Sequence, residues 1–137
     1  MQQHPSINLV QLYGPEHGIR ATAQDQIGVA TRQDPISGLP EISLYGKSFE
    51  SLSPSAQSLK SIDILIFDIQ DIGSRYYTYQ ATMALSMIAA AKANIPVIVL
   101  DRPNPITGHQ VEGGGILDPL RNYCGLYPIP QRHGMTV

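Results

Sequence analysis

Three groups of polar side chains follow three apolar runs of the chain, and these side chains are the ones that could carry chemistry. The apolar runs cover residues 8–14, 63–69 and 95–100. The polar groups are Glu16 and His17, then Asp68, Gln70, Asp71 and Arg75, and finally Asp101, Arg102 and Asn104. If the runs are parallel strands of one sheet, the groups converge at the edge where open α/β sheets carry their sites.

Glu16 is the leading candidate for a catalytic acid. It lies between Pro15 and His17-Gly18, on a turn just past a predicted strand. A glutamate that such a turn partly removes from water has a raised pKa, which suits a general acid. The structural alternative is that the Glu16 carboxylate caps the turn or pairs with Arg20.

A second carboxylate would make the group suitable for glycoside hydrolysis, which usually needs one carboxyl group as acid and another as nucleophile or base. The candidates are Asp68, Asp71 and Asp101. Two of them also have a structural interpretation. Asp101 could belong to a locally hydrogen-bonded turn, and Asp68, within the strand pattern, could be a buried hydrogen-bond acceptor.

Arginines and tyrosines in the same segments could bind a substrate. Arg20, Arg75 and Arg102 are each able to hold an anion in bidentate fashion, and the tyrosines of the 76–79 segment, Tyr76 first among them, could stack on a sugar ring. Arginines of this kind are also common in structural ion pairs, and tyrosines in ordinary packing.

Metal binding has little support in the sequence. His17 and His133 each precede a glycine, but no tight ligand spacing such as His-Glu-x-x-His occurs. The single cysteine, Cys124, excludes a cysteine-based zinc site and an internal disulfide. We therefore predict neither a metal nor a cofactor.

Composition favours one globular domain that acts on a small polar molecule or a glycan. The chain has 137 residues, of which 42% are hydrophobic and 15% charged, with a net charge of −2. These values argue against disorder, and the scattered basic residues argue against nucleic-acid binding. No apolar run is long enough to span a membrane, and the first residues lack a signal-peptide pattern.

The predicted elements are those of an α/β fold with a parallel sheet flanked by helices. A strand over 8–14 precedes a long loop over 16–41 that contains a turn at 34–40, and a short strand is predicted at 42–46. Ser53 and Pro54 predict the start of a helix that runs to Leu59. The strand at 63–69, expected to be covered on both faces, leads into a helix that ends near Ala93 and packs through Ala81, Leu85 and Ile88. The strand at 95–100 completes a parallel unit.

Several long motifs resemble those of the exo-β-N-acetylmuramidases of the NamZ type, a glycoside hydrolase family of peptidoglycan recycling also known as DUF1343. The resemblance runs from Asn8 to the last residue. The motifs are Tyr13-Gly14-Pro15-Glu16-His17-Gly18-Ile19-Arg20, the turn at 43–47, the segment 67–79, Val99-Leu100-Asp101-Arg102-Pro103-Asn104-Pro105, and the segment 128–136.

The resemblance implies a Rossmann-like catalytic domain that removes terminal N-acetylmuramic acid from the non-reducing end of peptidoglycan fragments without metal or nucleotide. Glu16 takes the general acid/base role, and Asp71 or Asp68 is expected to supply the second carboxylate. A cation must meet the lactyl carboxylate of the substrate. The residues expected to contact substrate are His17, Arg20, Gln70, Arg75, Tyr76, Asp101, Arg102, Asn104 and His133.

Members of this family usually have a further strand and helix before the equivalent of Asn8 and a second domain after the equivalent of Val137. We therefore expect residues 1–137 to be part of a single Rossmann-like catalytic domain, with an exposed sheet edge able to pair with another chain. The stretch alone is expected to bind substrate weakly. The family suggests the periplasm or the cell exterior.

Two other functions stay open at this point. One is a non-catalytic glycan-binding or scaffold module, in which the polar groups only hold loops together. The other is a metal-dependent hydrolase that uses Asp68, Asp71 and a histidine.

Overall fold

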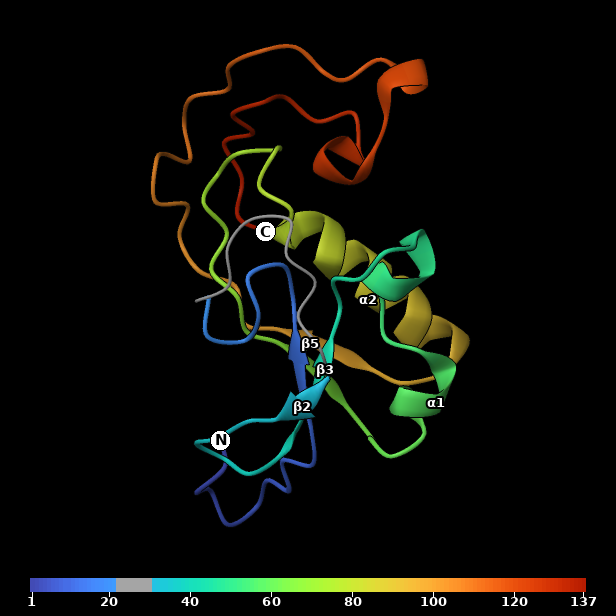
Figure 1. The fold of residues 1–137 in the computed structure, drawn as a ribbon. Helices are drawn as coiled ribbons and strands as arrows, with labels where there is room; N and C mark the ends of the chain where they lie inside the picture. Colours follow the sequence, from blue (N-terminus) through green and yellow to red (C-terminus); the bar gives the residue numbers. More distant parts are fainter. Residues whose placement is uncertain (22–30) are drawn as a thin grey trace.

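The computed structural model describes residues 1–21 and 31–137, in which two small β-sheets lie beside two α-helices (Figure 1). The helices α1 and α2 lie on one side of the strands. Long connections from the C-terminal third of the chain form a separate upper layer. The predicted α/β class is confirmed.

The first sheet contains β1 (Leu12–Gly14), β2 (Arg32–Gln33) and β3 (Pro40–Ser43) in the order β1-β3-β2. β1 is parallel to β3, and β2 is antiparallel to it. The predicted turn at 34–40 lies between β2 and β3, and β3 begins two residues before the strand predicted at 42–46. The loop prediction missed β2, because a strand of two residues has no period to detect. Residues 22–30 of that loop lie outside the described residues.

The second sheet pairs β4 (Leu65–Phe67) with β5 (Val97–Val99) in parallel, and α2 (Tyr79–Lys92) connects them. This strand, helix, strand unit agrees with the prediction. The expectation of one continuous sheet is wrong for the described strands, since β1 pairs with β3 and no ladder joins β1 to β4. The three polar groups therefore do not follow neighbouring strands of a single sheet, as the sequence had indicated.

The buried face of α2 differs from the predicted one. Tyr79, Thr82, Ser86 and Ala90 are buried with Ala81, whereas Ile88 is 46% exposed. Buried hydroxyls are tolerated here because they have partners, for example the Thr82 hydroxyl on the Thr78 carbonyl at 3.3 Å. The predicted end of the helix is confirmed, with its last turn followed by Asn94 at φ +56°.

The remaining helices are short. α1 (Ala56–Leu59) starts two residues later than predicted, because the Ser55 side chain, rather than that of Ser53, accepts the capping hydrogen bond from the Ser58 amide. Three 3₁₀ helices cover Phe49–Leu52 (η1), Asp118–Leu120 (η2) and Tyr123–Gly125 (η3). None of the helices in the described residues has the length and apolar character needed to cross a bilayer.

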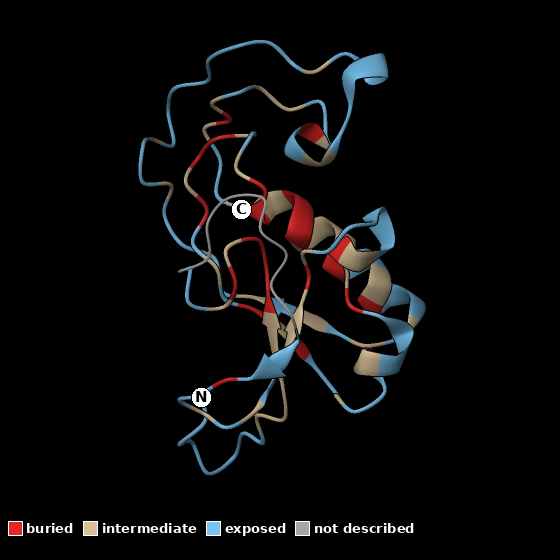
Figure 2. Ribbon diagram, viewed as in Figure 1, coloured by how far each residue is buried: buried red, intermediate tan, exposed pale blue. Residues whose placement is uncertain are grey.

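Burial is concentrated on α2, in parts of β3 and β4, and in the loops after β1 and β4, and the upper connections are mostly exposed (Figure 2). Coverage of the second sheet on both faces, as expected from its apolar sequence, is not found. Leu65 and Phe67 of β4 are buried, but Ile64 and Ile98 are 48% and 45% exposed. The reason is that α1 and α2 lie on the same side of this sheet (Figure 1).

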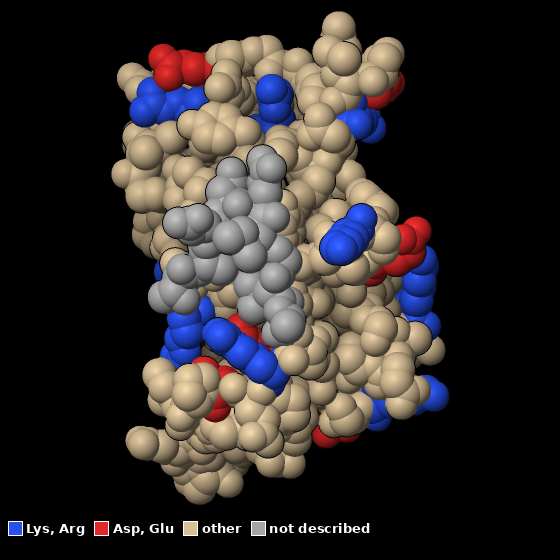
Figure 3. Space-filling view, viewed as in Figure 1, with Lys and Arg blue, Asp and Glu red and all other residues tan. Residues whose placement is uncertain are grey.

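Charged side chains of both signs are interspersed on the face shown in Figure 3, without a broad basic patch. This distribution agrees with the scattered lysines and arginines of the sequence.

Candidate functional site

Glu16 stands on a tight turn directly after β1. The Gly18 amide donates to the Pro15 carbonyl at 2.8 Å, and His17 has a φ of +70°. A non-glycine residue in this left-handed region costs on the order of 1–3 kcal/mol, and such strain is concentrated at functional sites. The turn is therefore held in its shape by the rest of the fold.

The carboxylate of Glu41 anchors the backbone of this turn. Glu41 is fully buried; its Oε1 accepts from the Ile19 amide at 3.2 Å, and its Oε2 accepts from Arg32 Nε at 3.0 Å. A Cβ on Gly14 would lie 3.0 Å from the same Oε1, so the glycine lets this carboxylate approach the turn. Glu41 thereby connects the turn to both β2 and β3.

The Glu16 side chain points into the protein, toward the start of α2. It is 6% exposed, and its Oε2 accepts a hydrogen bond from the Thr78 hydroxyl at 2.8 Å. Thr78 is the residue just before α2. The Glu16 carboxylate is therefore held at the N-terminal end of α2.

Two tyrosines lie close enough to this contact for the Glu16 charge to affect their pKa values. Burial raises the pKa of Tyr79 to about 12, with smaller contributions from Tyr77 and from the Glu16 charge. Burial also raises the pKa of Tyr123, whose hydroxyl lies 2.6 Å from that of Thr82. Both phenols therefore remain protonated at neutral pH, and Glu16 lies among groups that can donate hydrogen bonds.

Sequence reasoning missed Thr78 and Tyr123. Thr78 lies in the motif 67–79 and directly precedes the predicted helix, so its position alone could have marked it as a helix-terminal hydroxyl. Tyr123 has no such signal, because the chain between α2 and η3 is long and irregular.

Asp71 and His133 form a buried pair, although 62 residues separate them in the sequence. Asp71 Oδ2 lies 3.0 Å from His133 Nε2 and accepts from the Gly73 amide at 2.7 Å. His133 Nδ1 accepts from the Met135 amide at 3.2 Å. Since Nδ1 is an acceptor, the neutral ring carries its proton on Nε2 and donates it to Asp71.

The three candidate arginines have different partners. Arg20 forms a bidentate pair with the fully buried Asp34, with contacts of 2.8 and 2.9 Å, and Arg102 pairs with Asp68. Arg75 instead donates through Nη1 to the carbonyls of Gly114 and Ile129, at 2.8 and 2.6 Å. Among the described residues, Arg75 is thus the one of the three whose charge no carboxylate neutralises.

The other predicted residues of the second and third polar groups have separate surroundings. Gln70 donates to the Pro103 carbonyl at 3.4 Å, and Asn104 donates to the Met135 carbonyl at 2.9 Å. Asp101 accepts from the Arg102 amide at 2.9 Å, as expected for a local turn, and Tyr76 is 55% exposed.

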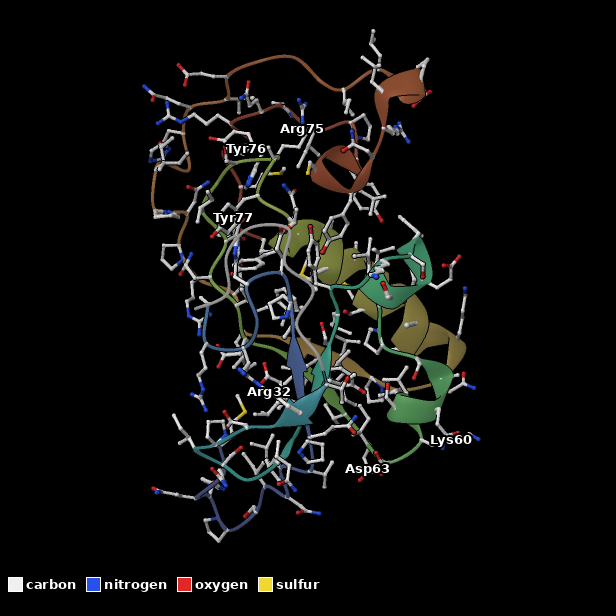
Figure 4. All side chains as sticks on the ribbon, in the orientation of Figure 1. Arg32, Lys60, Asp63, Arg75, Tyr76 and Tyr77 are labelled. Atoms are coloured by element: carbon white, nitrogen blue, oxygen red, sulfur yellow. The ribbon has the colours of Figure 1, made fainter. Side chains whose placement is uncertain are left out.

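The structure thus brings the second and third polar groups together through the Asp68–Arg102 pair. Glu16 contacts the segment between β4 and α2 through its hydrogen bond with Thr78. In Figure 4, Arg75, Tyr76 and Tyr77 lie on the loop before α2, far from Arg32, Lys60 and Asp63. Within residues 1–21 and 31–137, no three histidine, cysteine or carboxylate side chains converge as metal ligands. Asp68 pairs with Arg102 rather than with the Asp71–His133 pair.

Comparison with known proteins gives consistent results. The family model described as "Exo-beta-N-acetylmuramidase NamZ, N-terminal" matches residues 1–137. The peptidoglycan beta-N-acetylmuramidase NamZ of Bacillus subtilis (strain 168) is 49% identical over 138 aligned residues, which cover 100% of this chain and 32% of that protein.

Two crystal structures of DUF1343 family proteins from Bacteroides fragilis NCTC 9343 have a similar fold. One has a TM-score of 0.86 at 44% identity and covers 98% of this chain and 33% of its own. The other has a TM-score of 0.76 at 38% identity, with 95% and 32% covered. The chain spans about one third of the length of the relatives it matches.

The Arg20–Asp34 pair predicts a pH-dependent stability. Hydrogen bonds from the Ser37 hydroxyl and from Arg20 hold the pKa of Asp34 well below its ordinary value of 3.8. The stabilisation is present above pH 3.8 and is lost as pH falls through the lower folded-state pKa. We expect Arg20→Gln to reduce stability by the same amount at pH 7 and pH 5, and the difference from the wild type to shrink only at strongly acid pH, as measured by urea unfolding at pH 7, 5 and 2.

The control is Arg121→Gln, which removes an exposed ion pair with Asp118. It should change stability by less than about 1 kcal/mol at any pH. A constant difference between the wild type and Arg20→Gln at all three pH values would contradict the prediction.

Proposed function

The chain belongs to the NamZ N-terminal family, and on this basis we propose that it supplies the general acid/base of an exo-acting glycoside hydrolase. The reaction is release of terminal β-N-acetylmuramic acid from the non-reducing end of peptidoglycan fragments. Glu16 is the acid/base. We further propose that residues 1–137 are part of a single Rossmann-like catalytic domain and that the full-length protein carries the activity.

The buried contact between Glu16 and Thr78 supports this role most directly. The hydroxyl of Thr78 occupies Oε2 of Glu16, so Oε1 is the oxygen that would carry the proton. Glu41 holds the backbone of the turn, and the start of α2 holds the side chain. An acid that must protonate one oxygen of a substrate needs both kinds of restraint.

In the proposed reaction, Oε1 of Glu16 donates its proton to the glycosidic oxygen while the bond from that oxygen to the anomeric carbon breaks. The departing sugar leaves as an alcohol. The Glu16 carboxylate then accepts a proton from the water that completes hydrolysis. The hydroxyls of Thr78, Tyr79 and Tyr123 replace water around the carboxylate without competing as bases, because the two phenols stay protonated.

Asp71 is the better of the two candidates for the second carboxylate. Asp68 is exposed and its charge is matched by Arg102. Asp71 is buried and held in one orientation by Gly73 and His133. In this proposal His133 is a positioning residue for Asp71 rather than a direct ligand of the sugar.

Arg75 is the best candidate to bind the lactyl carboxylate of the substrate. Arg20 and Arg102 already pair with Asp34 and Asp68, so an incoming anion would have to displace a carboxylate there. The guanidinium of Arg75 contacts only carbonyl groups among its described partners and retains its full charge for a ligand.

Replacing Glu16 tests the central assignment. We expect Glu16→Gln to lower kcat for a chromogenic β-N-acetylmuramide by about 10²–10⁴-fold, because the amide cannot donate an acidic proton. The measurement is dye release by the full-length protein. The matched control is Glu50→Gln at an exposed site, which should keep the wild-type rate.

Two further arms separate the alternatives. Thr78→Val should lower kcat, and Thr78→Ser should restore it, since only the serine returns the hydroxyl. A chelator should leave the rate unchanged; loss of activity on chelation would favour the metal-dependent hydrolase. Full activity of Glu16→Gln, or sugar binding without turnover by the wild type, would favour the binding-module hypothesis.

The role of Arg75 predicts a change in substrate selectivity. Arg75→Met should raise KM for a β-N-acetylmuramide by about tenfold or more, equivalent to the loss of a charge-assisted hydrogen bond. It should leave any activity on the matching β-N-acetylglucosaminide unchanged, because that substrate has no lactyl group. Equal losses on both substrates would mean that Arg75 only holds the connections at Gly114 and Ile129.

We also propose that the exposed strand edges allow self-association of the 137-residue chain. β1 and β4 each have one edge outside any described ladder, and an apolar groove of about 720 Å³ lies along both. Such an edge is a template for pairing with a strand of a second copy.

This self-association should depend on concentration and on the groove. We expect the molar mass from light scattering to rise with protein concentration, and Val10→Lys, within the groove, to suppress the rise. Ile36→Lys changes a residue that is 74% exposed and lies outside the groove, so it should not suppress it. A constant monomer mass at all concentrations would refute the proposal.

A further inference from the structure

We infer that the cavity beside Asp71 binds the acetamido group of an N-acetylated hexosamine, with Asp71 Oδ1 as the acceptor for its N–H. The cavity has a volume of about 160 Å³. This inference deepens the proposed function and rests on it for the identity of the sugar. The observations that carry it are a buried oxygen with no partner among the described residues, the chemistry of the lining, and the position of Arg75.

Asp71 Oδ1 is buried and has no hydrogen-bond partner among the described residues. The other oxygen of the same carboxylate accepts two hydrogen bonds, from the Gly73 amide and His133 Nε2. Buried carboxylate oxygens are rarely left unpaired in native proteins. Because Asp71 also lines the cavity, a donor placed there would complete its hydrogen bonding.

The other residues that line the cavity determine which kind of hydrogen-bond donor fits there. Apolar side chains dominate it, among them Met83, Ile129 and Met135, and the Thr136 hydroxyl is also present. An acetamido group matches all three kinds of neighbour: its N–H reaches Asp71, its methyl contacts the apolar side chains, and its carbonyl accepts from Thr136.

Other groups of the proposed substrate fit less well. The lactyl carboxylate would be repelled by the Asp71 carboxylate, and Nδ1 of His133 already accepts from the Met135 amide. A sugar hydroxyl could donate to Asp71 but would leave the apolar side chains without a partner. Gln80, which also lines the cavity, already donates to the carbonyls of Ser74 and Arg75.

Arg75 lies next to this cavity. Its Nη1 donates to the carbonyl of Ile129, a residue of the cavity lining, at 2.6 Å. In muramic acid the acetamido group and the lactyl ether are attached to neighbouring ring carbons. A cavity for a neutral amide beside an arginine that pairs with no carboxylate in the described part of the chain matches that pair of groups. Asp71, the second carboxylate of the proposed reaction, then accepts the hydrogen bond from the acetamido N–H of the substrate.

Asp71→Asn tests this inference without removing volume. Oδ2 accepts both existing hydrogen bonds, so the asparagine keeps its carbonyl oxygen there and turns its NH₂ toward the cavity. A donor then faces the acetamido N–H. With N-acetylglucosamine as the probe, we expect saturation-transfer NMR of the full-length protein to show strong saturation of the acetamido methyl and loss of that signal in Asp71→Asn. Asp63→Asn, at an exposed site, is the matched control and should keep the signal.

A kinetic comparison separates recognition from catalysis. The substrates are a chromogenic β-N-acetylmuramide and its analogue with a hydroxyl in place of the acetamido group. Asp71→Asn should lower kcat/KM for both substrates through its proposed role as second carboxylate, and by about a further tenfold or more for the first, because only that substrate carries the acetamido N–H. Equal losses on both substrates, in a variant whose circular dichroism and melting temperature match the wild type, would overturn the inference.

The outcomes of the two experiments are distinguishable. If no glycoside is cleaved but the methyl signal still depends on Asp71, the cavity assignment stands and the proposed function fails. If cleavage is normal and the methyl signal is the same in both proteins, the cavity assignment fails alone. Should Asp71→Asn not fold, Thr136→Val replaces it: we expect about tenfold weaker binding of N-acetylglucosamine, with Thr136→Ser close to the wild type, and unchanged binding in both would overturn the inference.

Discussion

The buried carboxylate of Glu41 joins three parts of the molecule that would otherwise be separate. It accepts from the Ile19 amide in the turn after β1, it pairs with Arg32 of β2, and it belongs to β3 itself. A buried charge of this kind is costly unless it is fully paired, so the surrounding backbone must adopt the arrangement that pairs it. The strained turn that carries Glu16 is stable because of this constraint.

The same arrangement determines which way Glu16 points. With the turn held on Glu41, the Glu16 side chain reaches the start of α2, where Thr78 donates to it. The helix presents hydroxyl groups along its buried face rather than a purely apolar stripe. A polar helix face is expensive to bury for stability alone, but it provides donors beside a carboxylate. The composition of this face is easier to understand as part of a site than as part of a core.

Ion pairs also distinguish between side chains of the same type. Three arginines and two aspartates have similar settings in the sequence, each shortly after an apolar run. In the structure, Arg20 and Arg102 are neutralised by Asp34 and Asp68. Arg75 contacts carbonyl groups, and one oxygen of Asp71 has no hydrogen-bond partner in residues 1–21 and 31–137. Only groups with unused charge or unused hydrogen-bonding capacity can bind a ligand strongly, which leaves Arg75 and Asp71 as the candidates.

The sequence by itself determined the α/β class, the strand, helix, strand unit around α2, the end of α2 at Asn94 and the motifs that identify the family. These features depend on local patterns, such as apolar runs, caps and turn residues, that the chain carries whatever its partners are. The tertiary structure decided that β1 pairs with β3, that α2 buries Thr82 and Ser86 instead of Ile88, and that Glu16 meets Thr78 while Asp71 meets His133. Each of these depends on contacts between residues far apart in the chain, and hydrogen bonds of that kind leave no periodic trace in a single sequence.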